Sequence, residues 1–218
     1  MYKILSFMIL KILQKKFVVF SKSKIGMFGK GAAVFDTRNM NEDELLKIYR
    51  NLSSSECIIE EVIKQNDELG EFNNTSVNTL RVVTLICSDN KTKIMAAVLR
   101  MGRDGKTVDN FHHNGLAGIV DIENGIINAP AIDRIFKRYL FHPDSKKQII
   151  GYRIPCWDKV IELVVQAANV IPDVRYVGWD IAIDSNNNIQ IIEGNFGADP
   201  DVTQMPCRED KWVDFKCE

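Results

Sequence analysis

The sequence predicts an α+β fold in which antiparallel hairpins alternate with helices. Two pairs of strand-like runs, each joined by a short run of turn-type residues, indicate hairpins. Two further segments carry apolar residues at helical spacing. With 218 residues, 45% of them hydrophobic, the chain can build a core as one large domain or as two lobes. The hairpins are 79–87 with 93–101 and 176–184 with 189–194, and the helices are 41–52 and 157–170.

The other elements follow in chain order. Asn41 with Glu44 three residues on has the pattern of a capping box, which places the start of the first helix. A polar stretch rich in Asn and Glu is the best candidate for a hinge or a lobe boundary. The strands are 17–21, 32–36 and 57–63, the polar stretch is 64–76, and short strands and turns lie between the loop 109–118 and the second helix.

Composition excludes several classes of protein. The 28 basic and 29 acidic residues give a net charge of −1, which does not favour a general nucleic-acid binder. Five cysteines without a C-x-x-C pair, together with only three histidines, do not favour zinc. The odd number of cysteines fits a reducing cytoplasm better than a disulfide scaffold.

The amino-terminal segment 1–16 and the residues just after it are apolar with interspersed lysines. Its longest uncharged run, Ile4 to Leu10, is far shorter than the roughly 20 residues that a bilayer span needs. No small-residue cleavage site of a secretory signal follows. We therefore predict no transmembrane span and a segment that packs on the body of the protein, with peripheral membrane contact as the alternative.

A glycine-rich turn at 26–31 lies between the first two strands. Its glycines and neighbouring lysines, from Lys22 to Gly31, suit a loop whose amide groups close over phosphates. The pattern of a P-loop is absent and no helix follows. The alternative is a loop that only reverses the chain.

The last hairpin carries the most informative residues. If its loop is Ser185 to Asn188, Asp184 faces Ile189, and counting back along both strands sets Asp180 opposite Glu193. Asn195 is two residues beyond Glu193, so the two share a face.

Two carboxylates opposed across a ladder would destabilise the hairpin unless a cation lies between them. Asp180, Glu193 and Asn195 offer only oxygen ligands, which suit Mg²⁺ or Mn²⁺ completed by water and phosphate oxygens. The alternatives are an exposed hairpin edge with solvated charges, or a register slip that sends Asp180 to the other face.

The order of these features resembles the ATP-grasp superfamily, in particular its sugar-transfer-associated branch, over Phe17 to Gln204. The resemblance implies an ATP-grasp fold: two α+β lobes, with mainly antiparallel sheets, that clasp ATP. It divides the chain into the segment 1–16, a small lobe 17–63 with the glycine-rich loop, and a large lobe 64–218 with the metal site. The segments that carry it are FVVFSKSKIGMFGKGAAVFD, CIIEEVIKQ, SVNTLRVVT, DNFHHNG, HPDSKKQIIGYRIPCW and VGWDIAIDSNNNIQIIEGN.

The resemblance also implies roles for single residues. Arg81 and Arg100 match catalytic arginines near the transferred phosphate, although on the residues alone Arg81 would be interpreted as a surface residue in an ion pair. The metal ligands are the same Asp180, Glu193 and Asn195 that the register predicts. The positions that match nucleotide contacts are Lys22, Gly29, Lys30, Gly31, Glu60, Glu61, Ile63 and Asn110.

Three departures from the family pattern bear on activity. Ser23 stands where a proline usually follows the lysine, and Phe28 stands at a glycine-type loop position, so the loop is bulkier. Family members usually carry an amino-terminal domain before the lobes, and this chain starts almost at the first lobe. Nucleotide binding is therefore a firmer expectation than turnover.

The resemblance implies an ATP- and Mg²⁺-dependent carboxylate–amine ligase that forms an amide through an acyl phosphate. Its substrates would be a small-molecule carboxylate and an amine acceptor, a sugar or amino acid among the candidates, in surface polysaccharide biosynthesis. Two alternatives stay open: a small-molecule kinase of the same fold, and a catalytically degenerate ATP-binding module. We expect a cytoplasmic protein, with the inner face of the membrane as a further location, and the sequence leaves a homo-oligomer or a partner subunit open.

Overall fold

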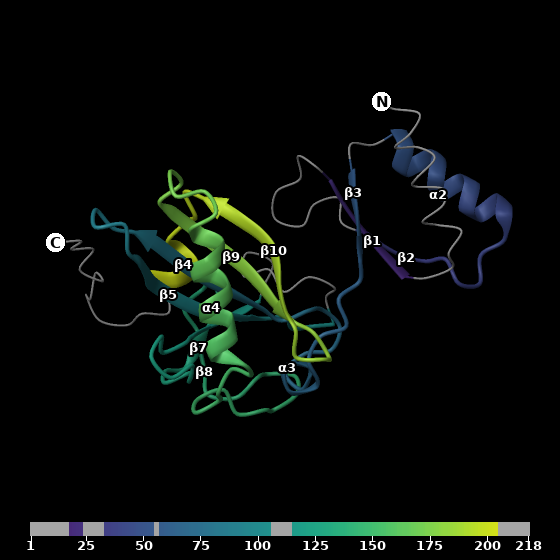
Figure 1. The fold of residues 1–218 in the computed structure, drawn as a ribbon. Coiled ribbons are helices and arrows are strands. Elements are labelled where there is room, and N and C mark those ends of the chain that lie inside the picture. The colour runs from purple at the N-terminus through teal and green to yellow at the C-terminus, as the bar shows by residue number, and fades with distance from the viewer. Residues whose placement is uncertain (1–17, 24–32, 55–56, 106–114, 205–218) are drawn as a thin grey trace. The chain divides into compact units, whose positions relative to one another are not determined.

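The computed structural model divides into two compact units, Met1–Ile63 and Lys64–Glu218 (Figure 1). Each unit has its own sheet and core, as an α+β fold with mainly antiparallel sheets requires. The α+β prediction is therefore confirmed. The structure describes residues 18–23, 33–54, 57–105 and 115–204.

The first unit pairs a three-stranded antiparallel sheet with one long helix. Val19 of the central strand packs with Leu45 and Leu52, which lie two turns apart on the helix and form its apolar face. The predicted capping box is confirmed: the Asn41 side chain accepts from the Glu44 amide at 3.0 Å, and the Glu44 carboxylate accepts from the Asn41 amide at 2.9 Å. The elements are β1 (Val18–Ser23), β2 (Ala33–Asp36), α2 (Glu42–Ser54) and β3 (Cys57–Glu61), and the strand order is β2-β1-β3.

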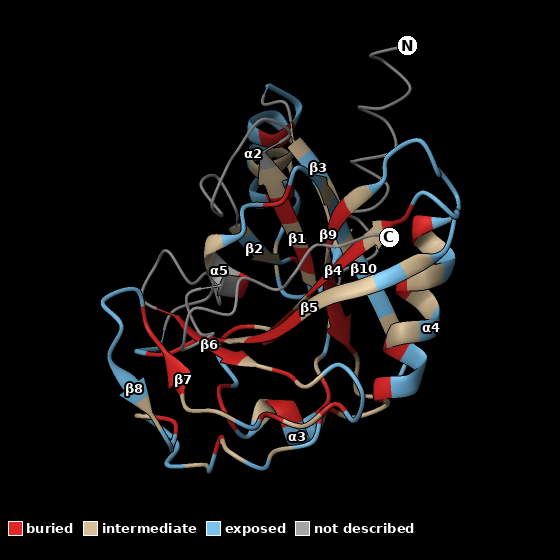
Figure 2. Ribbon diagram, turned by 90° about the vertical axis from the view of Figure 1, so that its left-hand side faces the viewer, coloured by how far each residue is buried: buried red, intermediate tan, exposed pale blue. Residues whose placement is uncertain are grey.

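The second unit is built on a seven-stranded sheet of order β10-β9-β4-β5-β6-β7-β8, in which every neighbouring pair is antiparallel. Val160 and Val164 of helix α4 are fully buried in one core with residues of β4, β5 and β9. Figure 2 shows long buried segments along the central strands β4 and β5. The strands are β4 (Thr79–Ile86), β5 (Thr92–Met101), β6 (Leu116–Ile119), β7 (Ala131–Ile132), β8 (Arg138–Tyr139), β9 (Tyr176–Ile183) and β10 (Ile189–Phe196), and the helices are α3 (Asp67–Gly70), α4 (Trp157–Ala168) and α5 (Asp201–Gln204).

Among the helices of the described residues, none combines the length and the apolarity that crossing a bilayer requires.

In the last hairpin, the residues that pair next to the turn differ from those predicted, although the predicted pairing of Asp180 with Glu193 holds. Ile183, not Asp184, pairs with Ile189, because Asp184 belongs to the turn and its carboxylate accepts hydrogen bonds from loop amides. A β-bulge between Ile191 and Glu193 then adds one residue to β10. The two offsets cancel, so Glu193 does pair with Asp180, as predicted.

The predicted hinge or lobe boundary, 64–76, begins where the structure divides into its two units, and the stretch is folded within the second unit. The buried Asn78 amide donates to the Gln65 side chain at 3.0 Å and to the carbonyls of Leu69 and Asn73. Buried polar groups are stable only when they are hydrogen-bonded, and this network satisfies them. A Cβ at Gly102 would lie 2.5 Å from the Asn73 amide nitrogen, so the network also depends on a glycine beside it.

Candidate functional site

Three charged side chains meet on the adjacent strands β9, β4 and β5 of the second unit. Arg81 and Asp180 are cross-strand partners, and the Arg81 Nε and Nη2 atoms lie 2.5 Å from Oδ1 and 3.1 Å from Oδ2 of Asp180. From the other side of β4, Arg100 brings its Nη2 atom to 3.1 Å from the same Oδ2. One carboxylate therefore holds two guanidinium groups.

This carboxylate is buried, since Asp180 is only 5% exposed. Burial alone raises the pKa of Asp180, but the charges of Arg100 and Arg81, with the hydrogen bonds from Arg81, outweigh burial and hold that pKa below its ordinary value. Arg81 forms the ion pair that its sequence alone suggested. The pair is buried rather than at the surface, because only 11% of the Arg81 side chain is exposed.

Two residues that sequence reasoning missed hold the arginines in place. The Thr79 hydroxyl oxygen accepts from Nε of Arg100 at 2.9 Å and from its Nη2 at 2.6 Å. A Cβ at Gly178 would lie 3.2 Å from Cδ of Arg81 and 2.5 Å from Cβ of Ala198, so only glycine leaves room for the arginine stem. Thr79 pairs with Arg100 in the first hairpin, but the register shifts between Val83 and Thr84, and counting from the predicted strand ends 87 and 93 sets Thr79 opposite Met101. Neither Thr79 nor Gly178 therefore carries a sequence signal of its role.

The other two predicted metal ligands lie on β10. Glu193 is the cross-strand partner of Asp180, and Asn195 donates its side-chain amide to the Glu193 carboxylate at 3.2 Å. Unlike Asp180, Glu193 is exposed. The structure thus brings the three oxygen-bearing side chains to the same part of the β9–β10 ribbon.

These three residues fit a divalent cation that prefers oxygen ligands. Oδ2 of Asp180 already contacts both arginines, whereas Oδ1 contacts Arg81 alone and keeps capacity for another ligand. Glu193 and the Asn195 carbonyl oxygen would supply the remaining protein ligands, a number usual for Mg²⁺, which keeps several waters or phosphate oxygens. Within the described residues, no group of three or more His, Cys, Asp or Glu side chains forms a metal site.

In the first unit, two of the predicted nucleotide contacts pair with each other. Nζ of Lys22 lies 3.0 Å from Oε1 of Glu60, and both side chains are partly exposed. Lys22 is opposite Ile58 and Glu60 is opposite Phe20, so the ion pair is the diagonal one on a single face of β1 and β3.

Of the remaining predicted nucleotide contacts, two lie in the first unit and the others lie outside the residues that the structure describes. Glu61 ends β3 and is exposed, and Ile63 follows it, partly buried. The predicted loop residues and Asn110 lie outside the described part of the chain. The loop residues are Gly29, Lys30 and Gly31. Among the described residues, the predicted nucleotide contacts therefore lie in the first unit, and the predicted metal ligands and catalytic arginines lie in the second.

The two antiparallel units and the acidic strand pair define an ATP-grasp protein. The ATP-grasp ligase PsnB, solved with a phosphomimetic variant of its minimal precursor, Mg and ADP, has a similar fold, with a TM-score of 0.53 and 14% identity over 94% of this chain and 46% of that one. Residues 13–210 match the family described as sugar-transfer associated ATP-grasp. The chain belongs to this family.

N5-carboxyaminoimidazole synthetase from Staphylococcus aureus, solved with ADP, is also similar, with a TM-score of 0.47 and 14% identity over 88% of this chain and 37% of that one. This chain thus spans less than half of either protein. No curated protein sequence matches it significantly.

Proposed function

We propose that the chain is an ATP- and Mg²⁺-dependent carboxylate–amine ligase. The observation that carries this proposal is the Asp180 carboxylate, held by Arg81 and Arg100 and paired across the ribbon with Glu193. Membership of the ATP-grasp family supports it, as do the similar ligases solved with ADP and, for PsnB, with Mg.

The charges of the site suit a nucleoside triphosphate with its cation. Two guanidinium groups balance two carboxylates, so a bound Mg²⁺ would leave the site with an excess positive charge that is complementary to a polyphosphate. Asp180, Glu193 and Asn195 would hold the Mg²⁺, which would supply positive charge to compensate the negative charge of the phosphates. Arg81 has more N–H donors than its bonds to Asp180 use, so it can bind a phosphoryl oxygen without releasing Asp180.

The proposed reaction has two steps. A substrate carboxylate oxygen forms a bond to the γ-phosphorus of ATP, and the bond from that phosphorus to the β-phosphate oxygen breaks and releases ADP. The amine nitrogen then attacks the acyl carbon, loses a proton and displaces phosphate to leave an amide. Arg81 and Arg100 hold the phosphoryl group in line during the first step.

ADP release in the presence of paired acids and amines tests this proposal. Hydroxylamine should trap the acyl phosphate as a hydroxamate, which a kinase product, a phosphate ester, cannot give. ADP formation without hydroxamate would favour the kinase, and tight ATP binding without ADP under any mixture would favour a degenerate module. Glu193→Gln serves as the negative control, since it removes an exposed metal ligand without touching the buried ion pairs.

We also propose that residues 17–63 and 64–218 are the two lobes that clasp ATP, with the segment 1–16 outside them. The ion pair of Lys22 with Glu60 in one unit and the Asp180 site in the other support two separate contributions. Photolabelling with 8-azido-ATP, followed by peptide mapping, should modify the first unit. If only the second unit is modified, both with and without added Mg²⁺, the small lobe has no nucleotide role.

The substrates we propose are a small-molecule acid and amine, one of them a sugar or amino acid used in surface polysaccharide. The family description, sugar-transfer associated, supports this class. We place the activity in the cytoplasm, where ATP is available and where an odd number of cysteines, five in all, stays reduced. A thermal-shift screen with Mg²⁺ and a non-hydrolysable ATP analogue should show a further rise in melting point with the correct acid. If sugar acids and amino acids give no rise, the substrate class is wrong.

A further inference from the structure

The hairpin between β7 and β8 exposes large apolar side chains at the edge of the sheet. Ile135 is 79% exposed and Phe136 is 62% exposed, and both lie in the turn that joins the two strands, the tip of the hairpin. Strand β8 is the last strand of the seven-stranded sheet, so this tip is far in strand order from the Asp180 site. Neighbouring large apolar residues exposed together mark an interaction surface more often than single ones do.

The backbone at the tip is unusual for the residue it carries. Phe136 has a φ of +62°, a left-handed conformation that glycine or asparagine adopts easily and that a bulky residue adopts at a cost. A phenylalanine that is both strained and exposed does not stabilise the fold by burial. Such positions are found where the side chain has a role outside the fold.

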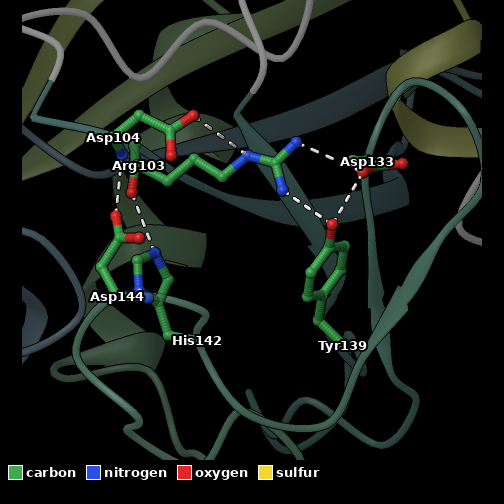
Figure 3. Close-up of polar contacts among 7 residues, drawn as sticks. Arg103, Asp104, Asp133, Tyr139, His142 and Asp144 are labelled. Atoms are coloured by element: carbon green, nitrogen blue, oxygen red, sulfur yellow. Dashed lines mark hydrogen bonds and ion pairs between the residues drawn. The ribbon is translucent and has the colours of Figure 1, made fainter.

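The tip is nonetheless held in one conformation by a buried clamp (Figure 3). Asp133 is 2% exposed, and its Oδ1 accepts from the amides of Ile135 and Lys137 at 3.0 Å each. Its Oδ2 accepts from the Tyr139 hydroxyl at 2.9 Å and from Arg103 at 3.2 Å. The apolar side chains are therefore displayed on a fixed support, which reduces the entropy cost of docking them.

Cations flank the apolar tip. Arg134, Lys137 and Arg138 are all exposed, and residues 134–141 contain no acidic residue. The whole chain has a net charge of −1, so this concentration of positive charge is local. An apolar tip with a cationic rim is complementary to an anionic lipid surface, where apolar side chains enter the acyl boundary and cations contact the headgroups.

We propose that the β7–β8 hairpin docks the protein on membranes that contain anionic lipid, with Ile135 and Phe136 inserted and Arg134, Lys137 and Arg138 on the headgroups. A second copy of the chain fits this surface poorly, because a two-fold interface would set the same cations against each other. The proposal does not depend on the ligase chemistry.

Vesicle co-sedimentation of the full chain tests this docking. The vesicles are phosphatidylcholine with and without phosphatidylglycerol, and the test variant replaces Ile135 and Phe136 by serine. The matched control replaces Val170 and Ile171 by serine, since these are 76% and 60% exposed but have Asp173 beside them and no such group of cations. All four positions are exposed, and thermal melting confirms that each variant is folded.

We expect the wild type and the control to bind vesicles that contain phosphatidylglycerol, and the tip variant to bind at least about tenfold more weakly. Arg134→Glu with Lys137→Glu should also weaken binding, and added salt should weaken the wild type. The proposal fails if the wild type does not bind anionic vesicles, or if the tip variant binds as well as the control. It also fails if sedimentation velocity shows that the tip holds a dimer together instead.

Discussion

Replacing Asp180 by asparagine separates the structural role of this residue from its proposed role as a metal ligand. The side chain keeps its shape but loses its charge and one acceptor atom. In either orientation of the new amide, its NH₂ group faces a guanidinium donor. With the carbonyl at the Oδ2 position the contacts to both arginines survive there, but the 2.5 Å bond from Nε of Arg81 is lost.

The cost follows from these contacts. A lost hydrogen bond to a charged group costs about 1.5–3 kcal/mol, and breaking a buried ion pair by removing one partner costs about 3–5 kcal/mol in all. Because Asp180 is 5% exposed and compensates two cations, we expect a loss in this upper range. Glu193→Gln removes an exposed carboxylate and should cost less than about 1 kcal/mol.

Urea unfolding without nucleotide or metal measures the difference. With a slope of about 2 kcal/mol/M, the midpoint should fall by roughly 1.5–2.5 M for Asp180→Asn. The folded-state pKa of Asp180 is depressed, so its contribution is fully present above the ordinary pKa of about 3.9 and disappears as pH falls through the folded-state value. The gap between wild type and variant should therefore be largest near neutral pH and should close in acid.

Equal midpoints for Asp180→Asn and Glu193→Gln at neutral pH would refute this reasoning. A gap that stays constant down to acid pH would also refute it, because a charge effect must disappear on protonation. Both variants should lose Mg²⁺-dependent ATP binding, so only the ligand-free measurement distinguishes them.

Three other substitutions test single contacts within the second unit. Thr79→Val removes the oxygen that accepts two bonds from Arg100 and should cost about 1–2 kcal/mol of unfolding free energy in urea; an unchanged midpoint would argue against this anchor. Gly102→Ala should lower the free energy of unfolding by about 1–3 kcal/mol, since its Cβ would lie 2.3 Å from a hydroxyl oxygen. Gly70→Ala is the control, because its Cβ would meet nothing closer than 3.8 Å. Equal effects of the two substitutions would contradict the steric argument. His142 is buried, which lowers its pKa, so the stability that it contributes should be lost as pH falls below about 6.5. His142→Gln should remove this pH dependence of stability in acid titrations followed by fluorescence. A variant with the same pH profile as the wild type would show that His142 is not the source of the dependence.

Local patterns in the sequence predicted the elements that depend on neighbouring residues. The Asn41 and Glu44 spacing identified a helix start because a capping box involves only one turn. The register of the last hairpin was harder. Apolar residues at Ile189, Ile191 and Ile192 give no clear alternation, so the bulge and the shifted turn could not be seen, and the correct pairing of Asp180 came from two offsets that cancel.

Contacts between distant segments were beyond these patterns. Strand β4 lies between β9 and β5, so Asp180 meets arginines that precede it by many residues, and no spacing rule indicates which strands are neighbours. The family resemblance placed Arg81 and Arg100 near phosphate, but not in contact with a metal ligand. The fold of the polar stretch 64–76 was also beyond these patterns, because the Asn66 side chain donates to that of Asn187, 121 residues away.

The arginine pair changes what Asp180 can contribute to the proposed site. An unpaired carboxylate pair across a ribbon would repel, and the sequence alone called for a cation between them. The structure shows that Arg81 and Arg100 already compensate the negative charge of Asp180. The exposed Glu193 is therefore the carboxylate whose charge a bound cation would chiefly compensate. In the proposed site, Asp180 therefore acts chiefly as a fixed anchor that aligns the phosphate-binding arginines, while Glu193 and Asn195 contribute most of the protein's metal ligation.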